Sequence, residues 1–318
     1  MGAADAVVKP EAAPLARDAG RALGATLVFL SALFWSFGGA IALFVAEAGS
    51  WTVVFWRSVW AAAFLLAFML WRDGPGGTVA LFRSMGWAGL AVGLCFATAS
   101  TSFVVALAYT TVANIVLMQA GVPLIAAAIA FAVFGERVNL ATAVAIVAVI
   151  AGVAVMVSDS LSGAGSLVGD GLALLIALAF SLATVLTRRF AHVRMTPATC
   201  LGVTLAGSFA ATQASSLAVS AFDMAVLFAF GALNLGLGLA LFASGARLVP
   251  AALAALLGTM ETVLSPVWVW LVHGQEPATR TLIGGGIVFA ALLVHLAFEL
   301  RRQARPAKPG SGGLPTPR

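Results

Sequence analysis

The sequence predicts an all-α integral membrane protein with ten transmembrane helices, arranged as two inverted five-helix repeats with both termini cytoplasmic. Three observations predict this fold class: the composition, the long apolar stretches, and the alternation of basic residues between them. Hydrophobic residues make up 62% of the chain and charged residues 9%, against about 25% charged in an average soluble protein. Only a polytopic membrane protein fits this composition.

The apolar stretches define the spans, because crossing a bilayer core takes about 20 helical residues. The first stretch is too long for a signal peptide, so we interpret it as a retained span. Residues 1–20 and 303–318 are rich in Ala, Pro, Gly and charge, and we predict disordered cytoplasmic tails there. The ten predicted spans cover residues 22–46, 52–71, 86–108, 112–134, 139–157, 170–187, 198–220, 224–246, 251–272 and 281–300.

Basic residues orient the helices, because cytoplasmic loops carry an excess of Lys and Arg. With a cytoplasmic N-terminus, all of the 17 Lys and Arg residues fall inside except Arg57 and Arg280. The net charge of +5 is then explained by topology, and we expect no nucleic-acid partner. An excess of Arg over Lys with abundant Ala is typical of GC-rich bacterial genes, so we expect a bacterial inner (plasma) membrane location.

The two halves of the chain resemble each other at an offset of 139 residues. Residues 112–138 align without a gap with residues 251–277, and ALFWS at 32–36 resembles ALAFS at 177–181. The identity is low, so the repeat depends mostly on shared hydropathy and helix count. Because each half has an odd number of spans, the two halves must insert in opposite senses.

We therefore divide the membrane domain into a first repeat over 21–158 and a second, inverted repeat over 159–302. Inverted repeats are common in secondary transporters, whose substrate site lies near the bilayer midplane between the repeats. No GxxxxGK[ST] phosphate-binding loop occurs in the chain, so we expect no ATP-driven step.

Several segments carry a resemblance to a known family. They are Trp35 in the first span, Arg57 early in the second, the run ALAYTTVANIVLMQAGVPLIAAAIAFAVFGERV at 106–138, and GQE in the second half. Over about residues 22–300 the chain resembles EamA-type transporters of the drug/metabolite transporter superfamily. The segment METVLSPVWVWL at 260–271 looks most like the aromatic amino-acid exporters of that branch. The resemblance implies a ten-helix exporter that works by alternating access.

One position departs from the pattern of that family. Its members often have a proline in the ninth helix where Thr262 aligns, whereas this chain has Pro266 four residues later. We therefore expect the bend of this helix, and the shape of the cavity beside it, to differ from the family pattern.

Glu261 is the only acid near the middle of a predicted span. Ionisable groups there cost about 2.5–3.5 kcal/mol on insertion scales and usually face the bundle interior. We predict that Glu261 binds a substrate ammonium group or carries coupled protons, since burial favours the neutral form of a carboxyl. The alternative is a structural hydrogen bond to a neighbouring helix.

Other polar and aromatic groups at similar depth complete the predicted substrate site. Each has a structural alternative: Asn234 and Gln119 as bonds between helices, the hydroxyls as bonds to their own backbone, and Trp35 as core packing. Arg57 is expected to be structural, by snorkelling or pairing with Glu47. The predicted substrate-binding residues are Trp35, Ser36, Thr98, Ser102, Met118, Gln119, Ser181, Asn234, Met260 and Glu261.

The sequence thus favours a secondary exporter of amino acids, aromatic or otherwise apolar, in contact with the lipid bilayer. Cationic drugs or other small metabolites remain alternative substrates. An intramembrane enzyme would need converging acids, histidines or a nucleophile, so we expect no catalytic residues and no cofactor. His192, His273 and His295 lack ligand spacing, and we expect no metal site. The sequence leaves the oligomeric state open and is compatible with a monomer.

Overall fold

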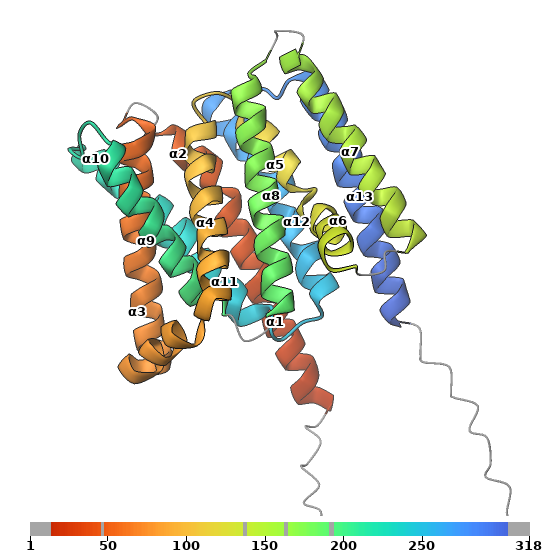
Figure 1. Cartoon of the computed structure of the whole chain (residues 1–318), viewed down its shortest axis with the longest axis horizontal. Helices are drawn as coiled ribbons and strands as arrows, with labels where there is room; N and C mark the ends of the chain where they lie inside the picture. Colours follow the sequence, from red (N-terminus) through yellow and green to blue (C-terminus); the bar gives the residue numbers. More distant parts are fainter. Residues whose placement is uncertain (1–13, 46–47, 136–138, 162–164, 191–193, 305–318) are drawn as a thin grey trace, which may run out of the picture.

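The computed structural model describes residues 14–45, 48–135, 139–161, 165–190 and 194–304. The regular structure of these residues is helical, and the helices pack side by side as one bundle (Figure 1). The start of α1 and the end of α13 lie at the same end of this bundle. An all-helical membrane protein follows from the chain's composition, because in lipid a helix satisfies its own backbone groups.

The first repeat contains seven helices in the described residues because two of its spans are broken. The first and fourth spans each consist of two pieces, α1 with α2 and α5 with α6. The bounds are α1 (Pro14–Ser36), α2 (Gly38–Leu43), α3 (Ser50–Ser84), α4 (Gly86–Ala106), α5 (Val112–Gln119), α6 (Val122–Phe134) and α7 (Leu140–Leu161).

The second repeat has a different irregularity, because its third span changes helix type. Residues 229–237 form a π-helix, η2, between two α-helical pieces. The bounds are α8 (Leu167–Arg189), α9 (Met195–Gln213), α10 (Ala221–Phe228), η2 (Ala229–Leu237), α11 (Gly238–Gly245), α12 (Ala251–His273) and α13 (Thr279–Ala304).

The prediction of ten apolar spans needs correction. Among the described residues, eight helical segments are long and apolar enough to cross a membrane, or nine if α5 and α6 form one bent span. The remaining predicted span, 198–220, corresponds to α9, a helix of 19 residues. Its threonines, serine and glutamine make α9 too polar to qualify, although it packs against α3 and α4 inside the bundle.

Two predicted boundaries also differ from the structure. Helix α1 begins at Pro14, so residues 14–20 are helical rather than part of a disordered tail. Proline is favoured in the first helical turn, where its missing N–H costs nothing. Helix α3 continues past the predicted end at residue 71 to Ser84, through a kink at Gly74, whose φ of 70° suits glycine. The rest of the predicted tails, 1–13 and 305–318, lies outside the described residues.

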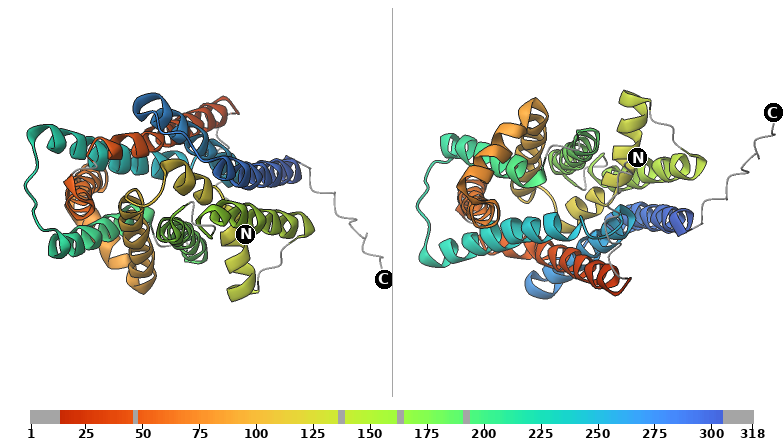
Figure 2. Two further views of the ribbon diagram at one scale, coloured as in Figure 1. Left: turned by 90° about the horizontal axis from the view of Figure 1, so that it is seen from above. Right: turned by 90° about the horizontal axis from the view of Figure 1, so that it is seen from below.

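Glycines bring helices of the two repeats into backbone contact. A Cβ at Gly152 of α7 would clash with the carbonyl of Gly284 in α13, and a Cβ at Gly284 would clash with Gly152 in turn. A Cβ at Gly202 of α9 would clash with the carbonyl of Gly93 in α4, and a Cβ at Gly93 would press on the carbonyl of Ala198 in α9. Small residues permit such close helix packing in membranes. Figure 2 shows α7 and α13 side by side from two directions.

Three predicted cytoplasmic arginines approach one another at one end of the bundle. Partial burial lowers the pKa of Arg247, the charges of Arg194 and Arg72 lower it further, and Asp73 raises it. Arg72 forms a salt bridge of 2.8 Å with Asp73. The part of α3 just before its kink, the end of α11 and the start of α9 therefore lie together, as the alternation of basic residues predicts. Which side of the membrane they face stays a prediction.

Candidate functional site

Asn234 forms hydrogen bonds beside the break in the first span. Its Nδ2 donates to the carbonyl oxygens of Phe34 at 2.6 Å and Trp35 at 3.2 Å. These carbonyls lie in the last turn of α1 beside the break at Phe37, and that of Phe34 also accepts a backbone hydrogen bond of 3.3 Å from the N–H of Phe37. Asn234 itself lies in the π-helix η2 and is only 4% exposed. The polar group predicted at midplane therefore joins the second repeat to the first.

Aromatic side chains of α1, α11 and α12 converge beside this break. The Nε1 of Trp268 donates to the Oγ of Ser36 at 3.0 Å, and its ring stacks on Phe37 with a centroid distance of 4.9 Å. Trp35 lies against Phe242 with ring centroids 5.5 Å apart. We call Trp35, Phe37, Phe242 and Trp268 the central aromatic cluster.

Trp35 is fixed by a glycine rather than by a hydrogen bond. Its Nε1 is buried without a partner among the described residues, and it packs directly against Gly238, the first residue of α11. The rest of the Trp35 side chain stays partly exposed. The indole is therefore packed closely at its Nε1 edge without being fully buried.

Glu261 lies on the face of α12 that packs against α1. It precedes Trp268 by seven residues, two helical turns, so both side chains leave α12 on the same side. Ala254 and Leu257 of α12 cluster with Val28 of α1, so Glu261 lies between this contact and the Trp268 contact. Its side chain is half-buried and makes no hydrogen bond or ion pair with any described residue.

The remaining predicted site residues do not gather at the central aromatic cluster. Met118 is fully buried in an apolar cluster with Cys95, Met156 and Ile176. The Oγ of Ser181 lies 2.7 Å from the carbonyl of Ala177 and 3.1 Å from that of Val122, so it contacts α6.

The other four predicted site residues show no hydrogen bond to the central aromatic cluster. Gln119 donates to the carbonyl of Ile115 in its own helix, Ser102 is buried, Met260 is half-buried, and Thr98 is exposed on the surface of α4. The third span has no distinct apolar face, so its sequence could not show which of its hydroxyl groups faces the inside of the bundle.

Arg57 is more deeply buried than snorkelling allows. It is 7% exposed, its Nη1 donates to Ser100 at 2.8 Å, and its guanidinium lies 4.3 Å from the centroid of Phe230. Its Nε is buried with no partner, and no described acid pairs with it. The expected partner Glu47 lies outside the described residues. Arg57 and Ser100 are polar groups that the predicted site did not include. The position of Arg57 inside a predicted span was the feature of the sequence that could have indicated its burial.

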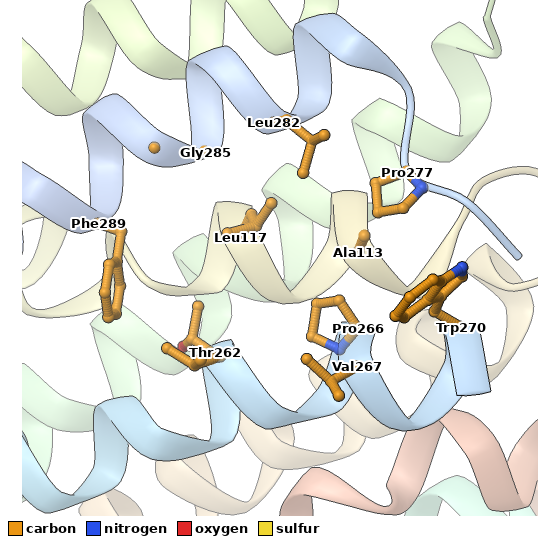
Figure 3. Close-up of a pocket in the computed structure, with 12 residues that line it drawn as sticks. Ala113, Leu117, Thr262, Pro266, Val267, Trp270, Pro277, Leu282, Gly285 and Phe289 are labelled. Carbon is orange, nitrogen blue, oxygen red and sulfur yellow. The ribbon is translucent and has the colours of Figure 1, made fainter. Parts of the chain in front are cut away.

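An apolar groove separates the two repeats on the other side of α12 (Figure 3). It has a volume of about 370 Å³ and lies between α5 of the first repeat and α12 and α13 of the second. Thr262 is the neighbour of Glu261 in sequence but faces this groove, so α12 presents chemically different faces to its two sides. The groove is lined by Ala113, Leu117, Thr262, Val263, Pro266, Val267, Trp270, Pro277, Leu282, Gly285, Gly286 and Phe289.

Broken spans in contact across two repeats are typical of membrane transporters for small molecules. Residues 22–158 and 167–297 each match the model of the EamA-like transporter family. The chain belongs to this family, within the drug/metabolite transporter superfamily, and is a multi-pass secondary transporter rather than an enzyme.

Comparison with solved structures supports the fold alone. One crystal structure of a protein aligns with a TM-score of 0.63 at 17% identity over 89% of this chain and 99% of its own. No curated protein matches the chain in sequence.

Proposed function

We propose that the protein exports amino acids with aromatic or other apolar side chains, by alternating access around the central aromatic cluster. The observation that carries this proposal is the placement of an unpartnered half-buried carboxylate, Glu261, on the same face of α12 as Trp268. Glu261 would bind the ammonium group of the substrate, and the exposed edge of Trp35 would contact its apolar side chain. The composition favours a bacterial inner membrane location.

The experiment is a counterflow screen of the twenty amino acids with purified protein in proteoliposomes. We expect exchange of phenylalanine, tryptophan or large aliphatic amino acids. Glu261→Gln should abolish this exchange, and the matched control Glu276→Gln, an exposed acid after α12, should retain it. Unchanged exchange and unchanged pH dependence in Glu261→Gln would exclude both ammonium binding and proton carriage by this residue.

A second candidate substrate class is organic cations. An unpaired acid beside aromatic rings also suits a cation without a carboxylate, because ring faces attract cations. Comparing phenylalanine with phenethylamine, which lacks only the carboxylate, separates the two. Exchange of phenethylamine alone would assign the protein to cationic drugs, while exchange of phenylalanine alone would support amino-acid export.

A further inference from the structure

A second polar site joins the two repeats at the start of α8. The Nδ2 of Asn114 in α5 donates to the Oδ1 of Asp170 in α8 at 2.6 Å and to the Oγ1 of Thr110 at 2.9 Å. Both Asn114 and Asp170 are only 4% exposed. The site lies at the end of the bundle opposite the start of α1 (Figure 1). Val112 and Val116, two positions before and after Asn114 in α5, share an apolar cluster with Trp268 of the central aromatic cluster.

This site holds two oxygen atoms that have no donor. The Oδ2 of Asp170 and the Oδ1 of Asn114 are both buried, and neither has a hydrogen-bond partner among the described residues. A buried acceptor without a donor costs about 1–3 kcal/mol, and more for a charged group. A contact that only held two helices together would not need to leave an open acceptor on each of its two side chains.

No charge on the described neighbours compensates the carboxylate. Helix α8 packs against α4, α5, α6 and α7. The titratable side chains on these helices are the thiol of Cys95 in α4 and Asp159 in α7, whose side chain lies outside the described ones. Tyr109 precedes α5 and is exposed. No described Lys, Arg or His pairs with Asp170.

The backbone around this site offers further oxygen ligands. The carbonyl of Tyr109, in the connection between α4 and α5, lies against Gly169, next to Asp170. Unwound backbone carbonyls beside helix ends coordinate Na⁺ and protons in secondary transporters. A small cation would satisfy both open acceptors of this hydrogen-bonded pair, whereas a water molecule would leave the charge of the carboxylate uncompensated.

We propose that Asp170 and Asn114 form a binding site for a small monovalent cation, either a proton or Na⁺, that bridges the two repeats. Occupation by this cation ties α5 to α8, and its departure leaves two unpaired acceptors that favour separation of these helices. The site thereby links the concentration of a cation to the packing of the repeats. It does not depend on which substrate occupies the central aromatic cluster.

The test measures thermal unfolding of the purified full-length chain, with two cation arms. One arm compares NaCl with choline chloride at equal ionic strength, and the other lowers the pH without sodium. A ligand that binds only the folded state raises the unfolding midpoint. We expect wild type to be stabilised in one arm, which identifies the cation, and Asp170→Asn in neither.

Asp170→Asn should fold, because its amide can donate to the Oδ1 of Asn114 and so imitates the occupied site. The control is Asp223→Asn, because Asp223 also lies in the first turn of a helix but accepts a hydrogen bond of 2.8 Å from Ser220. This control should respond to the cation as wild type does.

Two outcomes would overturn the proposal: a wild type that responds in neither arm, which means a bridging water only, or an Asp170→Asn variant that responds like Asp223→Asn. If Asp170→Asn does not fold, Asn114→Ser replaces it, because serine removes the amide acceptor and leaves the carboxylate. A weakened cation response in Asn114→Ser supports the site, and an unchanged one overturns it.

Discussion

Both repeats match the same family and each has five predicted spans, but the breaks in their helices fall in different spans. In the first repeat, the first span breaks at Phe37 and the fourth bends by 45° between Gln119 and Val122. In the second repeat, the corresponding helices α8 and α12 are continuous. The breaks of the first repeat are contacted by side chains of the second, namely Asn234 and Ser181. The repeats are therefore complementary in structure rather than equivalent.

The largest expected effect on stability comes from removing the hydrogen bonds of Asn234 at the break in the first span. Asn234→Ala leaves the carbonyls of Phe34 and Trp35 without their side-chain donor, and we expect it to lower the free energy of unfolding by about 2–4 kcal/mol. The control is Ser244→Ala, because Ser244 bonds only to Ala240 in its own helix. Denaturant unfolding in detergent measures both variants. Equal effects of the two substitutions would mean that the hydrogen bonds of Asn234 do not stabilise the break in the first span.

The two prolines provide a direct contrast between the repeats. Pro266 lies inside α12, where proline costs about 3 kcal/mol relative to alanine. Pro123 lies in the first turn of α6, where proline is tolerated. We expect Pro266→Ala to raise the unfolding midpoint and Pro123→Ala to leave it nearly unchanged. A larger stabilisation by Pro123→Ala would show that the bend of the fourth span is imposed by its proline.

A smaller effect is expected at the contact between Trp35 and Gly238. A Cβ at residue 238 would collide with the indole, so Gly238→Ala should displace the ring at a cost of about 1–3 kcal/mol. Substrate affinity should fall more than stability, because the ring borders the proposed cavity. Gly258→Ala in α12 is the control, since its added methyl meets open space. Tryptophan fluorescence and counterflow measure the two effects.

The smallest effect is expected at the fourth span. Ser181→Ala removes a hydroxyl that reaches the carbonyl of Val122, and interhelical bonds of this kind average about 0.6 kcal/mol. Thr184→Ala is the control, because Thr184 is exposed and bonds only to Phe180 in its own helix. If the two variants are equally stable, the hydroxyl of Ser181 bonds only to its own helix, and the break in the fourth span is not stabilised by the second repeat.

The span positions could be predicted because hydropathy is a local property of the sequence. Glu261 lies in the helix expected for the ninth span and Asn234 in the segment expected for the eighth, whereas their depth in the membrane stays a prediction. The breaks were harder to predict. Gly38 and Gly39 only permit the break at Phe37, whereas its position depends on Asn234, about two hundred residues away.

The polar pairs depend on tertiary contacts that sequence spacing does not contain. Arg57 meets Ser100 across two helices, and Asn114 meets Asp170 across the repeat boundary. Asp170 in the sequence resembles an ordinary acid near a helix start, where the helix dipole favours it. Only the burial of both partners shows that its second oxygen lacks a donor.

The glycine contacts bear on how such a molecule moves. Where Gly152 meets Gly284, and Gly202 meets Gly93, the main chains of opposite repeats approach so closely that a side chain does not fit between them. Each repeat is thus anchored to the other at two places. We therefore expect the units that exchange access between the membrane faces to be mixed bundles rather than the two sequence repeats, with α7 moving together with α13 and α4 with α9.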